Sequence, residues 1–405
     1  MAEKTAKGAG GETPVTFIVR NGLLAVGLTG LGLGMGALLR PDIRNALGQV
    51  SPISWLWLFP ILGLALAVHE GGHMLAGLWV GFRFLLLVLG PFRLIRGRRG
   101  LRLELNPNLL LYGGLTVSQP LDFRNLTRRF ATVAAGGPFA SLALGLFCAA
   151  LGYGLPFATT PPACRDSVQL ICRDVLAALT RANAPLVLVL LLAAFISISL
   201  AISTLVPAET SGNLSDGALL LSLSRSDRPA QLRAYLLMLQ AAFLAGDRPR
   251  QLDRSLVQRA VAVQAGGQLD ALARLYAYYY AIDTGDLLSA YDHLKVALAR
   301  YAEYPRSLRA ILGLEAAYFI AFHHHDPEAA GAWLGRGKGN SPPSGAWLRA
   351  EAAVLLAAGH RSEANHLAQL ALRQPASSMA PGITRAEREW LEAIIEKASA
   401  ARSIL

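Results

Sequence analysis

The chain has 405 residues, of which 16% are charged and 53% hydrophobic, with a mean hydropathy of +0.39 and a formal net charge of +11. Soluble proteins carry roughly 25% charged residues, which argues against a wholly soluble globular protein. The abundance of apolar residues and the presence of only three cysteines exclude a disordered chain and a disulfide-dense secreted scaffold. Charged residues make up 12% of residues 1–224 and 21% of residues 225–405, so the composition predicts a membrane part followed by an ordinary globular part.

Four apolar segments are long enough to cross the hydrocarbon core of a bilayer, which takes roughly 20 helical residues. They are residues 16–39, 53–82, 130–157 and 184–206. The small, polar residues 1–15 before them predict a disordered cytoplasmic tail. The apolar core of the first segment is longer than that of a typical signal peptide, so we expect a retained anchor rather than a cleaved signal.

The loops between these segments differ in positive charge. The loop between the second and third segments carries nine arginines, and the other loops carry far fewer. Basic residues are retained on the cytoplasmic side of a membrane, so we expect a multi-pass protein of the cell membrane with its N- and C-termini in the cytoplasm. We therefore attribute the net positive charge to the orientation of the chain in the lipid bilayer. No nucleic-acid partner is expected, because no basic–aromatic motif is present.

Two loops carry further local signals. Val88–Arg93 and Leu101–Leu105 have the composition of short strands, on either side of an arginine cluster. Cys164 and Cys172 lie in the loop expected outside, where a disulfide can form and persist. A bridge and two free thiols remain equal alternatives.

The second segment contains the sequence His69-Glu70-Gly71-Gly72-His73. Histidines at positions i and i+4 lie one turn apart on one helix face, so both imidazoles can bind one zinc ion, and the glutamate between them can activate water. Ionisable side chains at membrane depth are costly unless they are paired or functional. The pattern therefore predicts a catalytic zinc site in the membrane, in preference to polar residues that snorkel from a helix end.

A tetrahedral catalytic zinc needs a third protein ligand and keeps its fourth position for water. The fourth segment ends in a stretch broken by Pro207 and Gly212, and Asp216 follows this stretch. Broken backbone at membrane depth is tolerated only where protein or a water-filled cavity satisfies it. Asp216 is the expected third ligand, and Glu209, in the same broken stretch, is the alternative.

These motifs resemble those of the site-2 protease family of intramembrane zinc metalloproteases. The resemblance rests on His69–His73, on Ala-Gly-Gly-Pro at Ala135–Pro138, and on Leu-Val-Pro followed by Asp-Gly within Leu205–Gly217. It covers about residues 50–224, and the joint order of the three motifs is more specific than any one of them.

The resemblance implies a role for each residue of the site. His69, His73 and Asp216 would bind Zn2+, and Glu70 would serve as general base and later as proton donor. Phe84–Gln119 would be the membrane-associated strand region that helps to present an extended substrate.

The same resemblance marks four candidates for substrate positioning. Gly137 and Pro138 belong to the second motif. Thr204 stands where the family usually has asparagine, and the gap from proline to aspartate is longer than in the commonest version. Asn213, within that gap, is a candidate for the polar role of the missing asparagine.

Residues 228–405 alternate alanine-rich helical stretches with short breaks. The segments Gly285–Leu298 and Gly359–Leu372 share a pattern in which alanines follow the glycine at +5 and +12, and a weaker copy begins at His325 with Ala330. This resembles tetratricopeptide repeats and predicts a soluble α-helical solenoid with a concave surface for a cytoplasmic protein or peptide. A helical domain without a ligand is the alternative.

Two further predictions concern this half of the chain. Trp390 is expected on a capping helix. The run His323-His324-His325 is expected at a turn, and no metal is expected there because no acidic or cysteine partner stands at ligand spacing.

The sequence thus predicts an all-α protein, apart from the short strands, with a polytopic core over residues 16–224 and a helical repeat domain over residues 228–405. The expected function is an intramembrane zinc metalloendopeptidase that cleaves membrane-protein substrates. A non-enzymatic membrane adaptor is the alternative, and a metal-dependent transporter is less favoured because the spans show no internal symmetry.

Overall fold

The computed structural model describes residues 56–97, 100–106, 113–158, 184–210, 213–225, 227–337, 345–374 and 381–400. The chain divides into two compact units, which are called here the membrane unit (Glu12–Leu121 with Arg128–Leu221) and the helical unit (Asp122–Thr127 with Ser222–Leu405, and Met1–Gly11). The predicted tail 1–15, the predicted span 16–39 and the pair Cys164 and Cys172 lie outside the described residues.

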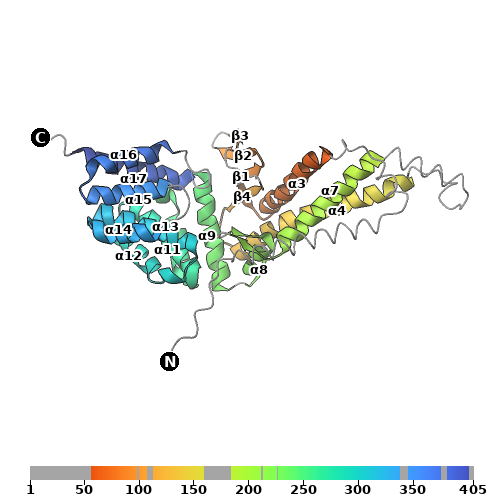
Figure 1. The fold of residues 1–405 in the computed structure, drawn as a ribbon. Coiled ribbons are helices and arrows are strands. Elements are labelled where there is room, and N and C mark those ends of the chain that lie inside the picture. Colours follow the sequence, from red (N-terminus) through yellow and green to blue (C-terminus); the bar gives the residue numbers. More distant parts are fainter. Residues whose placement is uncertain are drawn as a thin grey trace, which may run out of the picture. The chain divides into compact units, whose positions relative to one another are not determined.

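Three described helices are long and apolar enough to cross a membrane (Figure 1). They are α3 (Leu58–Trp79), α4 (Leu126–Ala158) and α7 (Ala184–Leu205). Their outer faces carry large exposed apolar side chains, such as Phe59 and Phe139. Such faces are typical of a membrane protein, because water would not tolerate apolar patches of this extent.

Close helix packing depends on small residues. A Cβ atom at Gly136 of α4 would lie 2.5 Å from the carbonyl oxygen of Gly72 in α3, and one at Gly145 would lie 2.5 Å from Ile198 of α7. Small residues let helix backbones approach within a membrane, where no hydrophobic effect drives them together. Gly72, next to His73, therefore lets α4 pack directly against the face of α3 that carries the histidines.

A four-stranded antiparallel sheet follows α3, with the strand order β3-β2-β1-β4. Its strands are β1 (Phe82–Leu89), β2 (Phe92–Gly97), β3 (Gly100–Leu105) and β4 (Leu115–Pro120). The strand predicted at Leu101–Leu105 is confirmed as β3.

The strand predicted at Val88–Arg93 is wrong. This segment comprises the end of β1, a turn at Gly90 and Pro91, and the start of β2. The predicted span 53–82 is also too long, because α3 ends at Trp79 and the chain turns at Val80 and Gly81 into β1. Since β1 is itself almost wholly apolar, hydropathy alone could not separate it from the helix.

After α7 the chain forms a small hairpin, β5 (Glu209–Thr210) with β6 (Asn213–Leu214), and then α8 (Asp216–Ser224). The Ser215 hydroxyl donates to the carbonyl oxygen of Val206 at 2.8 Å and accepts from the amide of Ala208 at 2.9 Å. These bonds satisfy the broken backbone at Pro207, as the sequence argument required.

The helical unit is built from nine described α-helices and short 3-10 and π turns. The helices are α9 (Arg228–Ala245), α10 (Arg254–Val263), α11 (Gly267–Thr284), α12 (Leu287–Leu298), α13 (Arg306–Phe319), α14 (Pro327–Gly337), α15 (Gly345–Ala357), α16 (Arg361–Arg373) and α17 (Pro381–Ser399). Within this unit α11 packs on α12, α13 on α14 and α15 on α16. The consecutive pairing agrees with helical hairpins, and the solenoid itself stays a prediction.

The repeated glycine–alanine pattern has a clear packing role. Gly285 ends α11 in the left-handed conformation, and the alanines at +5 and +12, Ala290 and Ala297, are buried between helices. Ala364 and Ala371 are buried at the same positions after Gly359. The predicted role of these residues as helix ends and small contact residues is confirmed.

One local prediction in this unit needs correction, and a second stays open. His323 and His324 belong to a π-helical turn, Ile320–His324, that continues α13, and only His325 occupies the turn. Trp390 lies on the last described helix, α17, and its side chain belongs to the main core, where it stacks near Tyr318 and Tyr279. Its expected place on a capping helix stays a prediction.

Candidate metal centre

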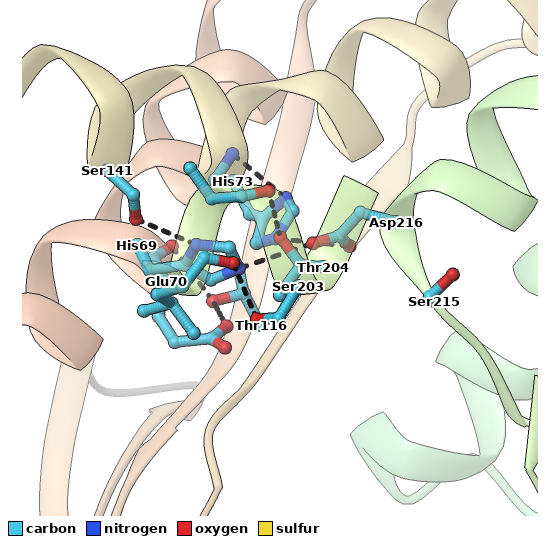
Figure 2. Close-up of polar contacts among 12 residues, drawn as sticks. His69, Glu70, His73, Thr116, Ser141, Ser203, Thr204, Ser215 and Asp216 are labelled. Carbon is cyan, nitrogen blue, oxygen red and sulfur yellow. Dashed lines mark hydrogen bonds and ion pairs between the residues drawn. The ribbon is translucent and has the colours of Figure 1, made fainter. Parts of the chain in front are cut away.

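The histidines of α3 and the aspartate that begins α8 converge at one point of the membrane unit (Figure 2). The Nε2 atom of His69 lies 3.2 Å from one carboxylate oxygen of Asp216, and the Nε2 atom of His73 lies 3.4 Å from the other. The two rings are one helical turn apart, with centroids separated by 5.0 Å. His69 is 4% exposed and His73 9% exposed, so both ligand candidates are buried.

Asp216 reaches the histidines because α8 starts against the end of α7. A Cβ atom at Gly217 would lie 2.5 Å from the carbonyl carbon of Leu205, so a larger residue at this position would push the start of α8 away. The glycine after the aspartate therefore has a packing reason, independent of any motif.

The second nitrogen of each imidazole is bound by α4. The Nδ1 atom of His69 lies 2.9 Å from the Ser141 hydroxyl, and the Nδ1 atom of His73 lies 2.7 Å from the carbonyl oxygen of Val133. A carbonyl oxygen only accepts hydrogen bonds, so Nδ1 of His73 carries the proton and its Nε2 presents a lone pair toward Asp216. The Gly137 amide, 3.3 Å from the same Nδ1, is the weaker contact.

Partners of this kind fix the orientation of metal-binding histidines and raise their basicity. Ser141 and Val133 were not identified from the sequence. Ser141 is a buried hydroxyl within an apolar helix, which is the signal that could have drawn attention to it.

Glu70 lies beside the metal ligands and contacts the sheet. Its side chain is 6% exposed, and the Thr116 hydroxyl of β4 lies 2.7 Å from its Oε2 atom. The carboxylate also packs on Gly114, where a Cβ atom would lie 2.9 Å from its Cδ. Thr116 and Gly114 were not identified from the sequence, although Gly114 belongs to a Gly-Gly pair in the expected strand region and Thr116 follows it.

The four candidates for substrate positioning lie on three different elements, α4, α7 and β6. Gly137 leaves room for the imidazole of His73, because a Cβ atom at position 137 would lie 2.7 Å from Cδ2 and Cε1 of that ring. Pro138 is buried next to it in α4. Thr204 lies in the last turn of α7, where its hydroxyl donates to the carbonyl oxygen of Ala201 at 3.3 Å.

Asn213 stands in β6, where its backbone pairs with Thr210. Glu209, the alternative third ligand, is exposed on β5, whereas Asp216 contacts both histidines. Geometry therefore favours Asp216 over Glu209.

The donor set fits a zinc ion. In the described part of the chain, His69, His73 and Asp216 form the one group of three or more such side chains whose ligand atoms lie within 4.8 Å of one another. Bonds of about 2.1 Å to a tetrahedral zinc place neighbouring ligand atoms about 3.4 Å apart, which agrees with the separations of 3.2 and 3.4 Å. Two imidazoles and one carboxylate leave the fourth position open, as in catalytic sites.

No family model matches the chain, and neither the curated proteins nor the solved structures contain a significant match to it.

Proposed function

We propose that the chain is an intramembrane zinc metalloendopeptidase of the site-2 protease type, which hydrolyses peptide bonds of membrane-embedded or membrane-anchored proteins. The observation that carries this proposal is the convergence of His69, His73 and Asp216 beside the buried carboxylate of Glu70. The site lies on a helix apolar enough to cross a membrane. Burying His69, Glu70 and His73 and half-burying Asp216 at membrane depth is costly without a function.

The chain's own residues divide the work of hydrolysis. His69, His73 and Asp216 would hold the zinc, which supplies a Lewis acid and lowers the pKa of a bound water to about 7. Glu70 takes the proton of the attacking water on its carboxylate and delivers it to the leaving nitrogen. The surrounding helices α3 and α4 exclude lipid from this proton transfer.

The position of the sheet next to Glu70 is evidence for a peptide as the substrate. An intact substrate helix hides its carbonyl groups in hydrogen bonds, so cleavage requires an extended segment. Of the two edge strands, β4 is the one that carries Thr116, the residue in contact with Glu70. A substrate strand laid along β4 would gain main-chain hydrogen bonds and bring its carbonyl groups next to the carboxylate.

The proposal extends to location and partners. Three apolar helices support a multi-pass protein of the cell membrane, and the arginine-rich loop supports cytoplasmic termini. The paired helices of the helical unit are proposed to recruit substrates or a cytoplasmic protein through a concave surface.

The membrane proteome tests this function directly. Cells that produce the wild-type chain are compared with cells that produce Glu70→Ala, and we expect at least one membrane protein to accumulate uncut in the variant. Glu209→Ala is the matched control, because it removes an exposed carboxylate of the same unit. The purified Glu70→Ala protein should keep its zinc, whereas Asp216→Ala should lose it.

Identical proteomes for the wild type and Glu70→Ala would refute proteolysis. If the Glu70→Ala protein also restored the phenotype of cells that lack the chain, the non-enzymatic membrane adaptor would be the better account.

A further inference from the structure

The Thr116 hydroxyl is the one side chain that donates a hydrogen bond to the Glu70 carboxylate among the described residues. Its Oγ1 atom lies 2.7 Å from Oε2 of Glu70 and 3.0 Å from the backbone oxygen of the same residue. Figure 2 shows both groups on the sheet side of the site, with Thr116 directed at Glu70. The partners of His69, His73 and Asp216 are other residues. Thr116 thus has hydrogen bonds to the proposed base, and none to the proposed metal ligands is found in the described residues.

The position of Thr116 is fixed by the sheet. Thr116 lies on β4 opposite Leu87 of β1, and both strands pack against α3. Two residues further along β4, Ser118 contacts α3 at Gly77, where a Cβ atom would lie 3.1 Å from the serine hydroxyl. The hydroxyl of Thr116 is therefore carried by a strand docked on the helix of Glu70, and not by a free loop.

Gly114 completes the contact from the other side. Its φ of +97° lies in the region that favours glycine, and its Cα packs against the carboxylate without a side chain in between. The carboxylate thus fits between a hydrogen-bond donor and a backbone surface of the same segment. Its rotamer is restricted from two sides.

A hydroxyl has a single hydrogen to donate, and the shorter of its two contacts is the one to Oε2. Oε1 contacts Gly114 and accepts no hydrogen bond from the described residues, so donation to Oε2 leaves Oε1 with the lone pairs that a general base needs for accepting a proton. We infer that Thr116 is a positioning residue that holds Glu70 in the orientation for proton transfer, an inference that rests on the proposed function. In this inference the strand region orients the general base Glu70, in addition to presenting the substrate.

The test uses the full-length, zinc-loaded protein in detergent micelles, with casein as an unfolded peptide probe. Thr116→Val keeps the shape and removes the hydroxyl, and Thr116→Ser keeps the hydroxyl. We expect Thr116→Val to lower kcat about 10- to 100-fold, as for small misplacements of a catalytic group, with KM and zinc affinity within about twofold of the wild type. Thr116→Ser should recover most of the rate.

Ser118→Ala is the matched control. It removes a hydroxyl from the same strand and the same face of the sheet, and the Ser118 hydroxyl is buried without a hydrogen-bond partner in the described residues. We expect no loss of kcat for this variant. A merely structural role of β4 would lower the rate and the zinc affinity together, and would affect Ser118→Ala as well.

The outcomes separate this inference from the proposed function. Full kcat in Thr116→Val, with an inactive Glu70→Gln, would overturn the positioning role and leave the protease standing. Parallel loss of zinc and rate in Thr116→Val would also overturn it. Equal casein cleavage by the wild type and Glu70→Gln would overturn the proposed function and the inference together.

Discussion

The two units of this chain bury charged groups in opposite ways. In the helical unit, Arg349 is fully buried, and its guanidinium lies 2.6 Å from the carboxylate of Glu315 and 4.0 Å from that of Glu387. In the membrane unit, Glu70 and Asp216 converge with two imidazoles, and no lysine or arginine pairs with them among the described residues.

We call Arg349, Glu315 and Glu387 the helical cluster, and His69, Glu70, His73 and Asp216 the membrane cluster. The difference between them shows what each cluster requires to balance its charge. The helical cluster is neutralised by its own ion pair and is further surrounded by aromatic rings, since the Arg349 guanidinium lies 4.5 Å from the ring of Tyr318 and 4.9 Å from that of Trp390. Such an arrangement provides its own cation without a ligand, although Nε and Nη1 of Arg349 have no hydrogen-bond partner in the described residues. The membrane cluster has two acids and no lysine or arginine partner among the described residues, so the metal ion proposed above would supply the missing positive charge.

The largest effect is expected from breaking the helical cluster. Arg349→Met leaves the buried carboxylate of Glu315 without its partner, which costs about 3–5 kcal/mol of unfolding free energy. Chemical denaturation of the full-length protein, followed by circular dichroism, measures this loss. The double variant with Glu315→Gln should recover part of it, because the carboxylate closest to Arg349 is then uncharged and only that of Glu387 has lost its cation.

Zinc affinity should stay unchanged in Arg349→Met, because the two clusters belong to different units. Loss of zinc without loss of stability would contradict the division into a structural and a functional cluster.

The membrane cluster is tested next by a change that spares every proposed ligand. Ser141→Ala removes the partner of His69 Nδ1 and should weaken zinc binding about 10- to 100-fold, the usual effect of losing such a partner. Competition with a chromophoric chelator measures the affinity. Ser197→Ala is the matched control, since Ser197 is equally buried in α7 and its hydroxyl has no partner in the described residues.

Unchanged zinc affinity in Ser141→Ala would mean that His69 is oriented by its helix alone. An equal loss in Ser197→Ala would point to general disturbance of the helix packing.

Local patterns were enough to predict part of the site. The spacing of His69, Glu70 and His73 defines a helix face by itself, and the broken segment before Asp216 signals an unusual position at membrane depth. The buried alanines of the helical unit follow their glycines at fixed spacing for the same local reason.

Contacts across elements could not be predicted in this way. Ser141 and Thr116 reach the site because α4 and β4 pack on particular faces of α3, and the sequence does not state which faces meet. The strand region expected at Phe84–Gln119 is close to the observed sheet. The boundary between α3 and β1 was missed because β1 is almost wholly apolar and reads as a continuation of the preceding helix.

The smallest effect is expected from a partly buried histidine of the helical unit when the pH falls. Burial, reinforced by the positive charge of Lys397, lowers the pKa of His323 in the helical unit to about 4, from an ordinary value of 6.5. The folded state therefore favours the neutral imidazole, whose Nε2 has no hydrogen-bond partner in the described residues. Its contribution to stability is complete above pH 6.5 and is lost as the pH falls from 6.5 toward 4.

Between pH 6.5 and pH 5 we expect the unfolding free energy to fall by about 1 kcal/mol, less than full linkage predicts because the side chain is partly exposed. Denaturation of the full-length protein at several pH values measures this slope, and His323→Leu should reduce it. His360→Leu is the control, because this histidine is exposed on the same unit. If both variants keep the wild-type slope, the acid sensitivity comes from other groups, and the π-helical turn contributes nothing to it.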